Sequence, residues 1–168
     1  MQTGETSFDF DEFFHQHYAR IARTVARVVG DPMRAEDLAV EAFWKLWRHR
    51  EAHGEKAGGW VYRTAIRLAL NDLRGAKRRS HYESQAGPAL VTANPEEQRA
   101  AAEEREQVRS VLAAIGERNA ELLLLRSSGL AYNDVAAALD LNPSSVGVMI
   151  SRAQQAFRKE YVKQYGEK

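Results

Sequence analysis

The stretch YNDVAAALDLNPSSVGVMISRA, residues 132–153, gives the clearest indication of a fold in this sequence. Its larger apolar residues have the spacing of two short helices joined by a tight turn; they are Val135, Leu139, Leu141, Val146 and Met149. Ala136 is small where the two helices must cross closely, and Asp140 stands where such a turn often needs a left-handed residue. The pattern predicts a helix-turn-helix.

The second helix of this pattern has a marked start. Asn142-Pro143 interrupts the chain, and Ser144 or Ser145 is expected to cap the helix that follows. The amino-terminal residues of a helix presented in this way can reach base edges in the major groove of DNA. Plain helical hairpins share the same spacing, so DNA binding and a purely structural hairpin both stay open at this point.

The rest of the sequence also repeats its apolar residues at helical spacing. One stripe runs from Phe10 to Val25, a second from Leu38 to Trp47 and a third from Val61 to Leu73. Asp31-Pro32 is expected to end the first helix, and the glycines of residues 53–59 indicate a loop before the third. No segment alternates with a period of two over the length of a strand, so the predicted fold class is all-α.

The composition changes at residues 81–94, where few large apolar residues occur. This segment is expected to be a flexible linker between two small helical domains, residues 8–80 and residues 95–161. Asn94 and Pro95 indicate the start of a helix, because asparagine accepts backbone N–H bonds at a helix start and proline fits the first helical position. Such a linker permits either a compact or an extended arrangement of the two domains.

The formal net charge of +1 conceals a segregation of charge along the 168 residues. Residues 60–80 carry six cations and one anion, whereas residues 83–106 carry six anions and two cations. A basic stripe of this kind is typical of phosphate binding, although it can also simply solvate the end of a helix. The apolar runs are too short to cross a bilayer and the acidic amino terminus is unlike a secretory leader, so we expect a cytoplasmic protein without membrane insertion.

In the order of its segments the chain resembles a bacterial extracytoplasmic-function (ECF) sigma factor, which has sigma domains two and four only. AEDLAVEAFWKLWRH (residues 35–49) resembles the helix of domain two that docks on RNA polymerase, and WVYRTAIRLALNDLRGAKRR (residues 60–79) resembles the helix that engages the minus-ten promoter element. Residues 116–161 resemble domain four, which reads the minus-thirty-five element. The resemblance implies a factor that binds core RNA polymerase and directs promoter-specific transcription initiation.

The resemblance also implies binding residues at matching positions. Asp37 and Glu41, which are four residues apart on one helix face, and Trp44 beside them are expected to bind polymerase, although a solvated face without a partner explains them too. The expected DNA-binding residues of domain two are Arg63, Arg67, Asn71, Arg74, Lys77 and Arg78. Those of domain four are Ser144, Ser145, Val148, Ser151 and Arg152.

Three positions depart from the family pattern. Val40 replaces a glutamine of the polymerase-binding segment, Ile66-Arg67 replaces an Arg-Asn pair of the minus-ten helix, and Ile150 replaces a lysine of the recognition helix. Two alternatives therefore stay open. One is a helix-turn-helix regulator that binds DNA without polymerase, and the other is a degenerate sigma-like protein that does not initiate transcription.

An enzymatic function is not expected. The absence of cysteine excludes a thiolate zinc site and a cysteine nucleophile, and no phosphate-cradling glycine loop occurs. His49 and His53 have a spacing that can ligate a metal on a helix, but no third ligand is placed by the sequence, so we expect no metal and no cofactor. The partners implied by the resemblance are core RNA polymerase, promoter DNA and an anti-sigma factor.

Overall fold

A computed structural model describes residues 7–80 and 94–167, except for the side chains of Lys77, Arg79 and Ser80. Seven α-helices and one short 3-10 helix make up the secondary structure of these residues, and no strand occurs among them. The predicted all-α fold class is confirmed. Residues 81–93 of the predicted linker lie outside the described residues.

Three helices form the N-terminal half of the molecule: α1 (Phe10–Val29), α2 (Pro32–Arg48) and α3 (Ala57–Ser80), with the 3-10 helix η1 (Arg50–Ala52) between α2 and α3. Each helix contributes one apolar face to a shared core, which includes Ile21, Phe43 and Leu70. Phe43 is the centre of an aromatic cluster supplied by α1, with ring centroids 4.8 Å from Phe14 and 6.1 Å from Phe13.

The boundaries of these helices follow local chemistry. Helix α1 is capped at its end by Gly30, whose φ of +75° is a left-handed conformation that glycine adopts without strain. Asp31 and Pro32 begin α2, because the Asp31 carboxylate accepts the backbone N–H of Met33 at 3.0 Å and proline occupies the first turn. The predicted loop over residues 53–59 is too long, since α3 begins at Ala57.

The C-terminal half contains α4 (Pro95–Ala114), α5 (Glu117–Ser127), α6 (Tyr132–Leu139) and α7 (Pro143–Tyr165). The predicted start of α4 is confirmed, because the Asn94 side chain accepts the backbone N–H of Glu96 at 3.2 Å. The carboxyl end of α7 packs on α4, where the Tyr161 hydroxyl donates to the Gln107 side chain at 2.9 Å. Helix α7 also packs on α5 and α6.

Helices α6 and α7 form the predicted helix-turn-helix. Asp140 caps α6 in the left-handed conformation, with φ 53° and ψ 47°. The prediction that Ser144 or Ser145 caps α7 is wrong, because Pro143 takes the first helical position and makes Asn142 the cap. The Asn142 side chain accepts both the backbone N–H of Ser144, at 3.1 Å, and the Ser144 hydroxyl, at 2.9 Å.

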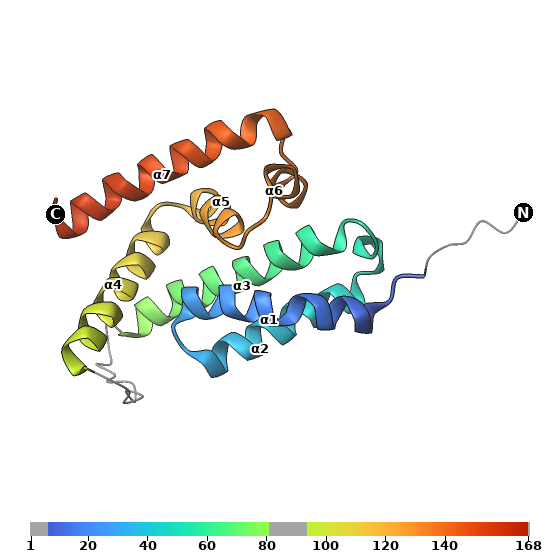
Figure 1. The fold of residues 1–168 in the computed structure, drawn as a ribbon, viewed down its shortest axis with the longest axis horizontal. Coiled ribbons are helices and arrows are strands. Elements are labelled where there is room, and N and C mark those ends of the chain that lie inside the picture. The colour runs from blue at the N-terminus through green and yellow to red at the C-terminus, as the bar shows by residue number, and fades with distance from the viewer. Residues whose placement is uncertain (1–6, 81–93, 168) are drawn as a thin grey trace, which may run out of the picture.

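The two halves pack against each other. Figure 1 shows α3 running between α1 and α2 on one side and α5 and α6 on the other. Gly59 of α3 lies so close to Ala138 of α6 that a Cβ added to the glycine would be 3.2 Å from the Ala138 Cα. Buried residues of both halves belong to one continuous apolar cluster. Of the two arrangements that the sequence permits, this structure has the compact one.

Candidate polymerase and nucleic-acid interfaces

The three residues predicted to bind polymerase lie together on the surface of α2. Asp37, Glu41 and Trp44 are all exposed, and Trp44 has 57% of its surface accessible. Positions four and seven residues apart share one face of a helix, so the two carboxylates and the indole form a common surface. The buried residues of α2 lie on its opposite side.

Two further apolar residues extend this surface. Val40 and Trp47 are each 51% exposed and follow the same helical spacing as Trp44. The prediction that Trp47 belongs to the inward apolar stripe of this helix is wrong, because its side chain is exposed. The spacing of residues 40, 44 and 47 could have revealed it as an outward residue. We call Asp37, Val40, Glu41, Trp44 and Trp47 the α2 face.

A shallow cavity adjoins the α2 face where α1 crosses α2. Its volume is about 320 Å³, and its lining combines Val40, Trp44 and Trp47 with Phe10 and Phe14 of α1. The rings of Phe10 and Trp47 are 5.0 Å apart in an edge-to-face arrangement. The α2 face therefore offers a partner both a pair of negative charges and an apolar hollow.

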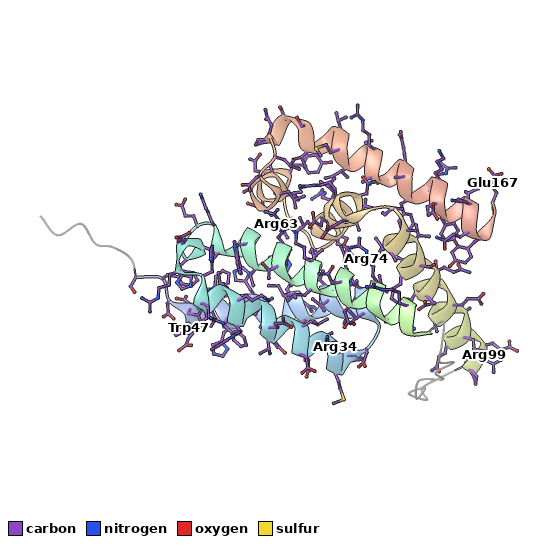
Figure 2. All side chains as sticks on the ribbon, turned by 180° about the vertical axis from the view of Figure 1, so that it is seen from behind. Arg34, Trp47, Arg63, Arg74, Arg99 and Glu167 are labelled. Carbon is purple, nitrogen blue, oxygen red and sulfur yellow. The ribbon has the colours of Figure 1, made fainter. Side chains whose placement is uncertain are left out.

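The carboxylates of α2 also affect a tyrosine of α1. Burial and, to a lesser degree, the negative charges of Glu36 and Asp37 raise the pKa of the Tyr18 phenol. At the start of the same helix, the Arg34 guanidinium donates to the Asp72 carboxylate of α3 at 2.8 Å, which ties the two helices together. Figure 2 shows Arg34 and Trp47 on the side of the molecule that faces away from α5–α7.

Two of the predicted DNA-binding residues of α3 face the C-terminal half. Arg67 Nε donates to Glu121 Oε1 of α5 at 2.6 Å, and the Glu121 side chain is only 2% exposed. Arg63 Nη1 lies 3.8 Å from Asp140 Oδ2 in the turn before α7, and the position of Arg63 between the two halves is visible in Figure 2. Contact with the C-terminal half therefore engages both guanidinium groups.

The remaining predicted residues of α3 lie beyond this contact. Asn71 and Arg78 are exposed and Arg74 is half-buried, while the side chain of Lys77 lies outside the described residues. These positions follow one another toward the carboxyl end of the helix, so the structure does not bring all six predicted residues onto one free surface.

The aromatic residues near the start of α3 belong to packed surroundings. Trp60 is half-buried and stacks on His49 with the ring centroids 5.2 Å apart. Tyr62 is only 3% exposed, and burial raises the pKa of its phenol. His53 is hydrogen-bonded to the carbonyl of Leu46 at 2.8 Å, so both histidines of the spacing noted above have structural contacts.

All predicted DNA-binding residues of α7 are exposed. Ser144, Ser145, Val148, Ser151 and Arg152 follow one side of the helix, and Val148 is 55% exposed. The opposite side is buried through Val146, Ile150 and Ala153. Ile150, which replaces the lysine of the family pattern, is therefore a core residue of this chain, and the loss of that cation is matched by a gain in apolar packing.

The described residues 7–80 and 94–167 contain neither a metal site nor a membrane-spanning helix. No group of three or more His, Asp or Glu side chains in that part of the chain is arranged to hold a metal ion. None of its helices has the length and apolar character needed to cross a membrane.

Comparison with known families matches the N-terminal half. Residues 13–79 match the family described as Sigma-70 region 2. This range includes the whole α2 face and almost all of α3. The N-terminal half of the chain is thus similar to region 2 of sigma-70-type factors.

Relatives of known class extend the match to nearly the whole chain. It is 25% identical over 159 residues to the ECF RNA polymerase sigma factor SigK of Mycolicibacterium vanbaalenii, which covers 89% of this chain and 80% of the relative. It is 26% identical over 166 residues to the ECF RNA polymerase sigma factor SigE of Mycolicibacterium smegmatis, covering 94% of this chain and 63% of the relative. Together with the region 2 match, these similarities show that the chain resembles ECF sigma factors over most of its length.

Two solved structures share the fold. One is CnrH, solved in complex with the cytosolic domain of CnrY, with a TM-score of 0.58, 17% identity and coverage of 89% of this chain and 85% of that one. The other is the sigma factor RpoE of Bartonella quintana, solved in complex with the anti-sigma factor NepR, with a TM-score of 0.52, 15% identity and coverage of 90% and 96%.

Proposed function

We propose that the chain binds core RNA polymerase through the α2 face and directs promoter-specific transcription initiation in the cytoplasm. The observation that carries this proposal is the match of residues 13–79 to Sigma-70 region 2, on whose surface the α2 face is exposed. In this proposal the chain gives the polymerase its promoter specificity. That role requires the chain to bind polymerase and DNA and does not require it to catalyse a reaction.

Each part of the chain has a separate role in this proposal. Residues 8–80 bind polymerase and the minus-ten element, residues 81–94 connect, and residues 95–161 bind the minus-thirty-five element. Support for the last assignment is the exposed side of α7, which carries Ser144, Ser145 and Arg152. Hydroxyl and guanidinium groups can donate hydrogen bonds to phosphates and base edges.

An anti-sigma factor is part of the proposal as a partner. Support comes from RpoE, a structural neighbour that was solved with an anti-sigma factor bound. Purification of the chain from its own cells, followed by identification of any bound protein, tests this part separately from polymerase binding.

The decisive experiment measures polymerase binding and transcription separately. The purified chain is mixed with core RNA polymerase, co-elution is measured, and run-off transcripts are assayed from the region upstream of its own gene. Co-elution with specific transcripts is the expected result. DNA binding without co-elution identifies a helix-turn-helix regulator instead, and co-elution without transcripts identifies a degenerate sigma-like protein.

A double variant tests the α2 face directly. Asp37→Ala with Glu41→Ala removes two exposed carboxylates and is expected to weaken polymerase affinity about tenfold or more, if each charge meets a basic partner residue. Glu103→Ala with Glu104→Ala on α4 makes the same charge change at exposed positions of the other half and serves as the control. Equal co-elution of both double variants contradicts the role of the α2 face.

A second pair of substitutions tests the DNA-binding residues. Arg74→Ala with Lys77→Ala, and separately Arg152→Ala, are expected to weaken promoter binding and to reduce its salt dependence by about one counterion per lost phosphate contact. Binding isotherms at several salt concentrations give the slopes. If a substitution leaves the salt dependence of promoter binding unchanged, the substituted residue does not contact phosphate in the DNA interface.

A further inference from the structure

The exposed side of α7 carries little charge for a surface predicted to bind DNA. At the described positions 144–155, the exposed residues are Ser144, Ser145, Val148, Ser151, Arg152, Gln154 and Gln155. Arg152 is the one charged side chain among them. These turns therefore offer few groups that attract phosphate, so their discrimination between promoters depends on contacts with base edges.

Val148 is the large apolar residue of this exposed side. Its side chain is 55% exposed, and Ser144 and Arg152 lie one helical turn before and after it on the same face. The core of the C-terminal half is filled from the opposite side of α7, through Val146 and Ile150. Val148 therefore contributes little to the core, and its apolar surface is removed from water only when a partner covers it.

The direction of the Val148 side chain is fixed by its surroundings. Val146 and Ile150, two residues before and after it, are buried and hold this part of α7 in place. Gly147 lies against α6, where a Cβ added to the glycine would be 3.4 Å from Tyr132 Cε2. A β-branched side chain inside a helix also has one strongly preferred χ1 rotamer. Contact with a partner therefore costs Val148 little conformational entropy.

An apolar side chain has a narrow choice of base edge in the major groove. Thymine presents a methyl group there, whereas guanine, adenine and cytosine present hydrogen-bond donors or acceptors. Against such a polar edge, valine would remove water without replacing its hydrogen bonds. The serine hydroxyls of α7 both donate and accept, so they fit several bases, and Arg152 fits guanine or a phosphate. Among these residues, Val148 has the narrowest preference.

We propose that Val148 is a specificity-determining residue, which recognises one thymine of the minus-thirty-five region through the 5-methyl group of that base. The inference rests on the proposed function and deepens it by naming the base that α7 selects. Burial of one methyl group changes an affinity by a factor of about four, so this contact is expected to contribute a preference of that size.

Uracil tests the inference on the unmodified chain, because uracil differs from thymine only by the absence of the 5-methyl group. Promoter fragments from upstream of the chain's own gene each carry one uracil in place of one thymine of the minus-thirty-five region. Holoenzyme assembled from core RNA polymerase and the full chain is titrated with each fragment. We expect one substitution to weaken promoter binding about threefold to fivefold and the others to have little effect.

A second pair of fragments returns the methyl group on a different base. Cytosine at the responding position is expected to bind less well than thymine, because its amino group faces valine. Cytosine methylated at carbon 5 carries a methyl group at the same place in the groove and is expected to recover part of the loss. Equal binding of cytosine and 5-methylcytosine contradicts recognition of the methyl group.

A matched pair of variants links the response to Val148. Val148→Ser removes both methyl groups at an exposed position, and serine and valine have similar helix propensities. This variant is expected to bind the thymine and uracil fragments equally. Val108→Ser makes the same change on α4, where Val108 is 37% exposed, and is expected to keep the response of the unmodified chain. Comparing both residues with both bases isolates the contact from a general loss of affinity.

The outcomes separate this inference from the proposed function. If no thymine of the region responds, or if Val148→Ser keeps the response, the inference is overturned, while promoter binding and specific transcripts from the unmodified holoenzyme leave the proposed function standing. If the unmodified chain binds neither polymerase nor promoter, the proposed function fails and the inference fails with it.

Discussion

Helices α3 and α7 are both predicted to bind DNA, yet their predicted binding residues have different surroundings in the structure. Arg63 and Arg67 of α3 face carboxylates of the C-terminal half, whereas the predicted residues of α7 are exposed to solvent. The difference arises because α3 has packed neighbours on two sides, while α7 keeps one side free opposite its buried Val146 and Ile150. Positive charge marks a surface that can bind phosphate, and only packing decides whether that surface is free.

The largest expected difference between the two helices is in stability. Arg67→Ala leaves the buried Glu121 without its partner and is expected to lower the free energy of unfolding by about 1–3 kcal/mol, a value reduced from that of a fully buried pair because Arg67 is 40% exposed. Arg152→Ala on exposed α7 is expected to change it by less than about 0.5 kcal/mol. Urea unfolding of both variants measures the difference, and similar values would mean that the Arg67–Glu121 pair adds nothing to stability.

A smaller effect on stability is expected at Asp140, in the turn between α6 and α7. Asp140 has a left-handed backbone and lies 3.8 Å from Arg63, but its side chain is 90% exposed, so the ion pair is weak. Asp140→Gly relieves the backbone and is expected to stabilise the fold by about 0.5 kcal/mol, while Asp140→Ala keeps the strain and destabilises it by about 1 kcal/mol. Thermal unfolding of both variants distinguishes the turn from the ion pair, because loss of the ion pair alone predicts equal destabilisation.

The smallest expected effect is a pH dependence of stability caused by His17 of α1. Burial and the positive charge of Arg20 lower the pKa of the His17 imidazole below its ordinary value of 6.5. The unfolded chain therefore binds more protons at mildly acid pH, so this stabilisation is complete above about pH 6.5 and is lost as the pH falls through the lowered value. The loss is expected to stay below about 1 kcal/mol, because solvent reaches the ring.

Urea unfolding between pH 5 and pH 7.5 checks this expectation. His17→Gln is expected to flatten the pH dependence. A pH dependence that does not change in this variant would mean that another group is responsible for it.

Much of the fold could be predicted because its signals are local. The left-handed Asp140 and the Asn94 cap follow from residue chemistry within one helical turn. The predicted end of the first helix at Asp31-Pro32 is confirmed, because α1 ends at Val29. The cap of α7 was misplaced because its local signals competed: Asn142 takes the cap that the neighbouring serines could also have supplied.

The candidate sites were predictable to a lesser degree. The spacing of Asp37, Glu41 and Trp44 correctly places them on one exposed face, because helical geometry fixes which residues share a side. Trp47 was misplaced, since an aromatic residue at the edge of an apolar stripe satisfies both the inward and the outward pattern. The partners of Arg63 and Arg67 lie 54 or more residues away along the chain, beyond the reach of any periodicity.

By itself the sequence determined the helices, the turn of the helix-turn-helix and the position of the basic helix, because each depends on residues within a few turns of one another. The tertiary structure alone decided that the two halves close on each other and that Glu121 meets Arg67. The physical reason is that a buried charge needs a partner, and which partner it finds depends on how distant helices pack.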